Sequence, residues 1–362
     1  MSTEAELVRY LLDSGLLTSS AVVDGRLRVR NASRRHQSFL VETRNGPSFF
    51  IKHGVDAEHC AALAREYAIY NYLSERAAAL VANSLPHLRI YDDDRHLLIL
   101  DLVPNAESLR DYHTRRGKFP KQVAAQLGVS LGMLHQLTLV DGTAEAERFR
   151  HGAPWILSVH RPHVAMLRDF SGATLQLIRF VQRIGELGER LEAMAEQWRQ
   201  ECLIHSDIKW DNGIISKGRS ARLVLVDWEV ASLGDPAWDI GSIFMDYLCF
   251  WVMSIPVTGE VPPEQFADLA RYGIADMQPA LREFWYAYVR VRKFGAAQSA
   301  ETLSRAVGLA AARLLQIAFE QAQTASRLTS NLVLCLQLAL NMLRRPETAA
   351  ADLLGILPAA EQ

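Results

Sequence analysis

Two short apolar runs, each followed by acidic residues, constrain this chain more than any other feature of its sequence. The first covers residues 203–204 and leads into Asp207 and Asn212, and the second covers residues 223–226 and leads into Asp227. Short apolar runs rich in valine, leucine and isoleucine are typical of buried strands. We therefore predict two strands, each of which delivers a carboxylate at its end.

Length and composition narrow the class of protein. A chain of 362 residues can form one large domain or two lobes, and 49% hydrophobic residues argue against disorder. The net charge of −2 gives no electrostatic reason to expect a nucleic acid or a membrane as partner. We expect a cytoplasmic protein, because the N-terminus lacks a signal peptide pattern and the scattered cysteines lack disulfide or metal spacing. These are Cys60, Cys202, Cys249 and Cys335.

The first hundred residues predict a small lobe of five strands and one long helix. The helix is expected over residues 56–79 with Asp56 as its N-cap, and a short amphipathic helix over residues 6–17 precedes the sheet. Pro104 cannot continue a strand ladder, so we place a domain boundary after residue 103. The strands are predicted over residues 26–30, 37–42, 48–53, 88–91 and 96–102.

Residues 104–362 are mainly helical in pattern. A strong helix is predicted over residues 122–137, where Gly128 and Gly132 would let a neighbouring helix pack closely. An apolar stretch over residues 331–343 is too short to span a bilayer, and we expect a buried helix there. Together the two regions predict an α+β fold, in which a small β-sheet lobe precedes a large, mainly helical lobe.

The motif residues resemble a known family. The segments His205-Ser206-Asp207, Asn212, Asp227 and residues 234–240 (Gly-Asp-Pro-Ala-Trp-Asp-Ile) are similar to the motifs of the aminoglycoside phosphotransferase and choline kinase-like group. That group is related to the protein kinases, so the resemblance implies a bilobal protein-kinase-like fold. It implies that residues 1–103 form a nucleotide-binding lobe and residues 104–362 a catalytic and acceptor-binding lobe. These motifs are specific for the superfamily and say little about the substrate.

The resemblance also implies roles for the motif residues. Asp207 would be the catalytic base that orients the acceptor hydroxyl, and a loop just after a buried strand can hold a carboxylate for this task. Asn212 and Asp227 would hold Mg²⁺, which prefers oxygen ligands of these types. His205 and Asp239 are expected to be structural, the first supporting the loop and the second lying near a helix start.

Lys52 lies near the end of the third predicted strand. Protein kinases carry a lysine at this place, and it contacts the α- and β-phosphates of ATP. GTP is the alternative nucleotide. Glu66, in the helix that follows, is expected to hold this lysine. At the junction between the lobes, backbone groups of Asp101 and Val103 are expected to pair with the nucleotide base.

The expected phosphate loop, residues 31–36, departs from the family pattern because it contains no glycine. Glycine lets backbone amides approach a phosphate closely. The amide and hydroxyl of Ser33, or the side chains of Arg34 and Arg35, are expected to take that role. The alternative is a solvated basic turn that contacts no nucleotide.

Lys209 is a second departure from the family pattern. Aminoglycoside-modifying relatives usually carry histidine there, whereas Ser/Thr protein kinases carry lysine, and we expect Lys209 to stabilise the transferred phosphate. Near-balanced acidic and basic residues argue against a polycationic acceptor. Five aromatic residues are expected either to line an acceptor cleft or to belong to the core. They are Tyr247, Phe250, Trp251, Trp285 and Tyr286.

The residues thus predict an Mg- and ATP-dependent phosphotransferase that moves the γ-phosphate to a hydroxyl acceptor, with Asp207 as base. The acceptor would be a small molecule or a peptide Ser/Thr. An alternative is a peptide kinase in the maturation of a ribosomally synthesised peptide, with a separate lyase partner. A third hypothesis is a pseudokinase-like scaffold, which the glycine-free loop supports and the retention of Lys52, Asp207, Asn212 and Asp227 opposes.

Overall fold

The computed structural model describes residues 4–23, 25, 27–32, 37–44, 46–140, 144–163, 168, 170–217, 221–256 and 263–357. The chain divides into two compact units. Unit 1 comprises residues 1–109 and 211–231, and unit 2 comprises residues 110–210 and 232–362. The domain boundary after residue 103 stays a prediction. The inclusion of residues 211–231 in unit 1 could not be read from chain order.

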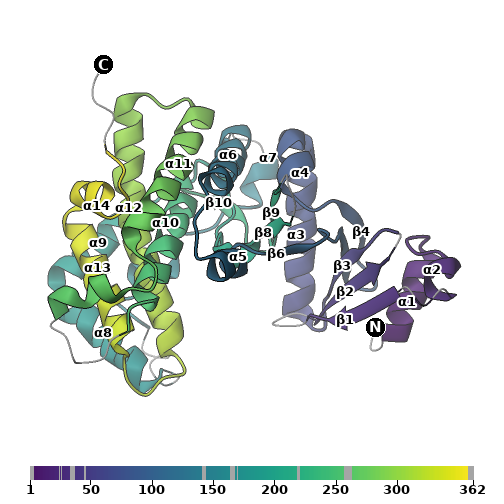
Figure 1. Ribbon diagram of the computed structural model, residues 1–362, viewed down its shortest axis with the longest axis horizontal. Coiled ribbons are helices and arrows are strands. Elements are labelled where there is room, and N and C mark those ends of the chain that lie inside the picture. Colours follow the sequence, from purple (N-terminus) through teal and green to yellow (C-terminus); the bar gives the residue numbers. More distant parts are fainter. Residues whose placement is uncertain are drawn as a thin grey trace. The chain divides into compact units, whose positions relative to one another are not determined.

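A five-stranded antiparallel sheet with strand order β1-β2-β3-β5-β4 dominates the start of unit 1 (Figure 1). The five predicted strands are confirmed, and their ends differ from the expected ones by at most one residue. The strands are β1 (Leu27–Asn31), β2 (Gln37–Thr43), β3 (Phe49–His53), β4 (Leu88–Asp92) and β5 (Leu97–Asp101).

The two faces of this sheet have different partners. Ile51 of β3 belongs to a core cluster with Leu7 and Leu11 of α1 (Glu4–Asp13), a helix that ends before residue 17 because Gly15 turns the chain at a φ of 72°. Successive side chains of a strand point to opposite faces. Lys52 therefore points away from this cluster.

The long predicted helix is present as α3 (Ala57–Arg76), which contacts β3 and β5. The predicted N-cap is confirmed, since Asp56 Oδ1 accepts a hydrogen bond of 2.9 Å from the amide of His59. The helix ends before residue 79 because Ala77 adopts a non-helical backbone conformation, with φ −137° and ψ 43°. A separate helix, α4 (Ala78–Ser84), begins directly after it. A short helix, α2 (Ser19–Val23), lies between α1 and the sheet strands in sequence.

A second, three-stranded sheet completes unit 1. Its order is β6-β8-β9, with β6 (Ala106–Ser108), β8 (Gly213–Ser216) and β9 (Leu223–Leu225), and both pairings are antiparallel. β9 was predicted from its apolar run, whereas β6 and β8 were not. Pairing with β6 is the reason why residues 211–231 join unit 1.

Unit 2 is mainly helical, which confirms the predicted α+β fold with a small sheet region and a helical remainder. Its two short strands, β7 (Cys202–Ile204) and β10 (Ser232–Gly234), pair antiparallel. The helices are α5 (Leu109–Arg116), α6 (Lys121–Leu137), α7 (Ala144–Glu147), α8 (Gly172–Arg183), α9 (Gly185–Glu196), α10 (Pro236–Met253), α11 (Ile274–Arg292), α12 (Ala296–Ala322), α13 (Ser330–Arg344) and α14 (Pro346–Asp352). Short 3-10 helices are η1 (Trp155–Ser158), η3 (Trp210–Asn212), which begins in unit 2 and ends in unit 1, and η4 (Pro263–Leu269).

The predicted close approach at the glycines of α6 is confirmed, and the neighbour is α11. A Cβ atom at Gly128 would lie 2.2 Å from the carbonyl oxygen of Phe284, and one at Gly132 would lie 2.9 Å from Cβ of Val291. The expected buried helix over residues 331–343 is α13, whose inward face includes Cys335. Within the described ranges, no helix is both long enough and apolar enough to cross a bilayer.

Candidate active site

An ion-paired lysine is the centre of the site in unit 1. Lys52 Nζ lies 2.7 Å from Glu66 Oε2 and 2.6 Å from Asp227 Oδ1. The side chains of Lys52 and Glu66 are 6% and 0% exposed, whereas that of Asp227 is 37% exposed. The predicted contact of Glu66 with Lys52 is present, and Asp227, predicted separately as a metal ligand, is a second partner of the same lysine. Asp227 remains reachable from solvent.

Electrostatics keep this lysine charged. Burial by itself would lower the pKa of Lys52, but the carboxylates of Glu66 and Asp227 outweigh burial and raise the pKa above its usual value. A buried ammonium held by two carboxylates is stable as an ion pair only when its geometry is good. Lys52 therefore presents a fixed positive charge at the end of its strand.

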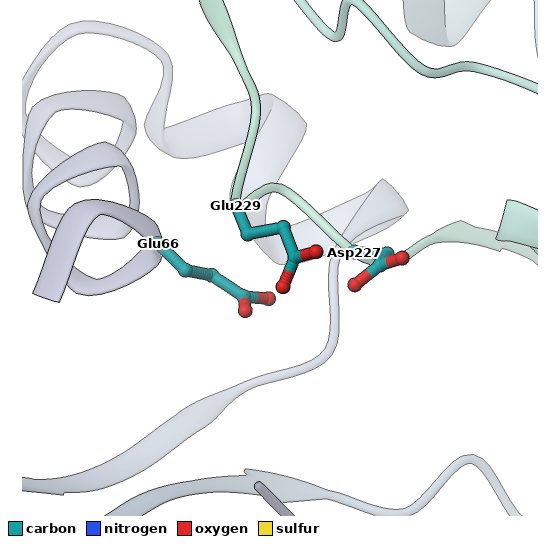
Figure 2. A group of neighbouring side chains, drawn as sticks. All are labelled: Glu66, Asp227 and Glu229. Carbon is teal, nitrogen blue, oxygen red and sulfur yellow. The ribbon is translucent and has the colours of Figure 1, made fainter. Parts of the chain in front are cut away.

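A third carboxylate, that of Glu229, joins this group. Figure 2 shows the side chains of Glu66, Asp227 and Glu229 converging, and their oxygens lie within 4.8 Å of one another. Sequence analysis assigned no role to Glu229. The signal for it is its position two residues after Asp227, in a segment that leaves a strand.

The β8–β9 hairpin places the two predicted metal ligands at the same end of a ribbon. Gly213 pairs with Leu225, so Asn212 directly precedes the paired segment and Asp227 follows it by two residues. The amide of Val226 also donates a 3.0 Å hydrogen bond to the carbonyl of Asn212. An amide oxygen and clustered carboxylates are hard donors, and such a set fits Mg²⁺.

The loop that carries Asp207 lies in unit 2 and is anchored by Asp239. The carboxylate of Asp239 accepts hydrogen bonds from the amides of His205 at 2.7 Å and Ser206 at 3.1 Å. The expectation that Asp239 is a structural anchor is thereby confirmed. Asp239 is fully buried at the start of α10, where the helix dipole favours its charge.

A buried histidine that sequence analysis missed supports this anchor. His135 Nε2 lies 3.2 Å from Asp239 Oδ2, and its Nδ1 lies 3.0 Å from the hydroxyl of Tyr288. Burial lowers the pKa of His135, although Asp239 opposes this shift. No local pattern could have found His135, because its partners come from α10 and α11.

Ser206 replaces the glycine that the family usually carries in this loop, and its backbone shows why glycine is common there. Ser206 has a φ of 68°, a conformation that side chains other than glycine rarely adopt. Its hydroxyl forms a 2.8 Å hydrogen bond with that of Ser232, and its carbonyl accepts one of 2.9 Å from the indole of Trp238. These contacts offset the cost of the backbone conformation.

Asp207 itself lies between two cations. Lys209 Nζ is 2.5 Å from Asp207 Oδ2, and Arg313 Nη2 of α12 is 3.7 Å from Oδ1. The side chain of Asp207 is 31% exposed, so solvent can reach it. Arg313 was not predicted. Its signal in the sequence is a single charged residue within the apolar stretch of residues 309–315.

The remaining predicted residues are placed as follows. Ser33 lies outside the described residues, as do Arg34 and Arg35. Asp101 ends β5 and pairs with Arg89 through bonds of 2.7 and 2.9 Å, while Val103 is half-buried. A role for either in nucleotide binding stays a prediction.

The five aromatic residues that were expected to line a cleft or to belong to the core differ in burial. Tyr247 and Trp285 are buried, which supports the core interpretation for these two. Tyr286 is exposed, and Phe250 and Trp251 are half-buried.

Comparison with known proteins agrees with this geometry. Residues 26–284 match the phosphotransferase enzyme family, and the chain belongs to that family. The prediction of a phosphotransferase that acts on hydroxyl groups is confirmed at the level of this class.

Solved structures share the fold at low sequence identity. The chain is similar to an amicoumacin kinase in complex with AMP-PNP, Ca²⁺ and Ami, with a TM-score of 0.52, 13% identity and coverage of 95% of this chain and 96% of that chain. It is also similar to a mutant aminoglycoside 2'-phosphotransferase-IIIa in complex with GDP, with a TM-score of 0.52, 11% identity and coverage of 97% and 99%.

One curated relative matches over a short segment. Acyl-CoA dehydrogenase family member 11 of Rattus norvegicus is 31% identical over 58 residues, which are 16% of this chain. The match spans 7% of the length of that protein. Nothing about the activity of that larger protein follows for this chain.

Proposed function

We propose that this chain transfers the γ-phosphate of a nucleoside triphosphate, ATP or GTP, to the hydroxyl group of an acceptor with the help of Mg²⁺. The observation that carries the proposal is the buried ion pair of Lys52 with Glu66 and Asp227. Its support is that a lysine fixed by two carboxylates can contact phosphate oxygens without losing its charge or position.

In this proposal unit 1 binds the nucleotide. Lys52 contacts the α- and β-phosphates, and Glu66 keeps its ammonium group in place. Ser33, Asp101 and Val103 remain our candidates for further nucleotide contacts. The amicoumacin kinase structure contains AMP-PNP and the 2'-phosphotransferase structure contains GDP, so proteins of this fold accommodate either purine.

Asn212 and Asp227 are the proposed ligands of Mg²⁺, and Glu229 lies close enough to add a carboxylate. An ion held by these side chains would supply positive charge that neutralises the charge developing on the phosphate oxygens. The excess of carboxylates over cations around Lys52 supports a divalent cation there. The Ca²⁺ in the amicoumacin kinase structure is consistent with divalent metal use in this fold.

Unit 2 supplies the proposed base. Asp207 accepts the proton of the acceptor hydroxyl and orients its oxygen for attack on the γ-phosphorus. Lys209 then stabilises the negative charge of the transferring phosphoryl group, and the two residues are already in contact. The fixed backbone around Ser206 keeps Asp207 in one orientation, which is what general base catalysis requires.

The acceptor class is proposed as a small hydroxyl compound. The two solved structures compared above, each with a TM-score of 0.52, are by name phosphotransferases of small molecules. A second candidate, a peptide Ser/Thr kinase with a separate lyase partner, is favoured only by the contact between Lys209 and Asp207. A location in the cytoplasm, without nucleic acid or membrane partners, stays a prediction.

Calorimetric titration with ATP and GTP, each with Mg²⁺, tests the nucleotide part of the proposal. We expect saturable binding to the native chain and a loss on the order of 100-fold for Lys52→Met, since a buried charge contact is removed. Lys121→Met removes an exposed lysine at the start of α6 and is the matched control. Unchanged affinity in Lys52→Met would contradict the assignment. An absence of binding to the native chain would support the scaffold hypothesis.

A further inference from the structure

Arg313 of α12 is an unusual residue because it is buried yet poorly paired. Its side chain is 4% exposed, and its guanidinium lies 5.2 Å from the ring centroid of Trp238. Its Nε is buried without a hydrogen-bond partner in the described part of the chain. Its one ion pair there is the 3.7 Å contact of Nη2 with Asp207 Oδ1, which is too long for a hydrogen bond.

A buried guanidinium with unpaired N–H groups lowers the stability of the fold unless a ligand or solvent accepts hydrogen bonds from it. Arginine carries five N–H donors in a rigid fork, and buried donors without acceptors destabilise a fold. Stacking on Trp238 satisfies the face of the group but none of its donors. The fork of Arg313 therefore has unused capacity at the position where it reaches the proposed base.

The charged side chains around Asp207 indicate which charge a ligand of Arg313 would carry. The carboxylate of Asp207 faces two cations, Lys209 and Arg313, and this pair of cations favours an anion over a further cation. Other acidic groups of unit 2 nearby in sequence are engaged elsewhere. Asp239 accepts from backbone amides, and Asp235 pairs with Arg305 of α12.

We propose that Arg313 binds an oxyanionic group, a carboxylate or a phosphate, on the acceptor whose hydroxyl is phosphorylated. This inference rests on the proposed function, because it names the acceptor class of that same reaction. The planar fork of arginine binds such groups through two parallel hydrogen bonds. An acceptor held by Arg313 places a hydroxyl within reach of Asp207, whereas a polycation would be repelled from the same position.

The first test is an acceptor screen that follows ADP release from Mg-ATP. Matched three-carbon compounds share the hydroxyl and differ in charge: glycerate, glycerol 3-phosphate, glycerol and 3-amino-1,2-propanediol. A broader library of hydroxyl compounds contains equal numbers of carboxylate, phosphate, neutral and ammonium members. We expect turnover within the two acidic classes, and a comparison of those two classes shows which oxyanion Arg313 prefers.

Turnover confined to neutral or ammonium compounds would overturn the inference and leave the proposed function intact. Mg-ATP binding without turnover of any acidic compound would also overturn it. A native chain that binds no nucleotide would instead refute the proposed function. The two failures are therefore distinguishable.

The second test compares native chain and Arg313→Met on the best acidic acceptor and on its neutral amide or ester. We expect kcat/KM for the acid to fall on the order of 100-fold, mainly through KM, because a buried charged contact is lost. The neutral derivative should show little difference between the two proteins. Equal losses on both compounds would assign Arg313 a structural role and overturn the inference.

Two further variants keep this comparison interpretable. Arg313→Lys retains the charge without the fork, and it should recover part of the affinity for the acid. It also replaces Arg313→Met if the latter fails to show a cooperative thermal transition. Arg327→Met removes an exposed arginine beyond the end of α12 and should match the native chain on every acceptor.

Discussion

The two units carry sites of opposite charge. In unit 1 a single ammonium, that of Lys52, faces the carboxylates of Glu66, Asp227 and the neighbouring Glu229. In unit 2 the carboxylate of Asp207 faces the cations of Lys209 and Arg313. One arrangement favours a further cation and the other favours a further anion.

The difference in charge shows how a phosphotransferase can separate its two binding tasks. A negative site attracts a divalent ion, and with it the polyphosphate that the ion accompanies. A positive site beside a carboxylate would favour an acidic substrate over a cationic one. Burial also differs, because the side chain of Lys52 in unit 1 is buried whereas that of Asp207 in unit 2 is partly exposed.

The largest expected effect is on the rate of phosphate transfer, and it comes from a substitution in the site of unit 2 alone. Asp207→Asn keeps the size of the side chain and removes the base, so we expect the rate of phosphate transfer to fall about 10²- to 10⁴-fold. Binding of Mg-nucleotide, measured by calorimetry, should remain close to that of the native chain. Asp276→Asn, at an exposed position in the first turn of α11, is the control. Full transfer activity in Asp207→Asn would refute the assigned base.

The next largest effect is on affinity for Mg-nucleotide, and it comes from a substitution in the site of unit 1. Asp227→Asn removes one of the converging carboxylates and one partner of Lys52, so we expect affinity for Mg-nucleotide to fall roughly 10- to 100-fold. Titrations at several Mg²⁺ concentrations should show that the variant needs more metal for the same affinity. If the Mg²⁺ dependence is that of the native chain, the metal role is wrong.

A third prediction concerns the stability of unit 2 at acidic pH, where a buried neutral histidine, in contrast to the ion pairs of the two sites, becomes unfavourable. His113 of α5 is buried against Trp210, with ring centroids 4.5 Å apart, and burial lowers its pKa to about 4. In the unfolded chain histidine binds a proton below about pH 6.5. Between these values the unfolded state binds more protons, so the stability of the folded state falls as pH falls.

We expect this histidine to account for about 2 kcal/mol of stability lost between pH 7 and pH 5. Urea unfolding at both pH values should therefore show a smaller loss for His113→Phe than for the native chain. His87→Gln changes an exposed histidine and should behave as the native chain does. Equal losses in all three proteins would contradict the assignment.

The smallest effect concerns the backbone beneath the base. Ser206→Ala keeps the unfavourable positive φ and loses the hydrogen bond to Ser232, so we expect a loss of about 1 kcal/mol. Ser206→Gly loses the same bond but relieves the backbone, and its stability should stay within about 0.5 kcal/mol of native. Chemical denaturation measures both, and a glycine variant less stable than the alanine variant would show that φ is not the cause.

Sequence analysis found the elements whose signals are local. The strands before Asp207 and Asp227 follow from apolar runs, and the cap of α3 follows from one aspartate before a helical pattern. It missed β6, β8 and β10, because glycine or polar residues occupy much of each of these strands, whereas β7 and β9 are wholly apolar. It also ended α1 too late, because it did not use the turn at Gly15.

The chain by itself determined the family, the fold class and the residues of the motifs, because short-range patterns and spacing are written in neighbouring positions. Tertiary structure alone decided which groups meet: Lys52 with Asp227, His135 with Asp239, and Arg313 with Asp207. These pairs join segments far apart in sequence, and packing of whole helices and sheets selects them. The charge of each site is therefore a property of the folded chain, since it sums groups that no local pattern connects.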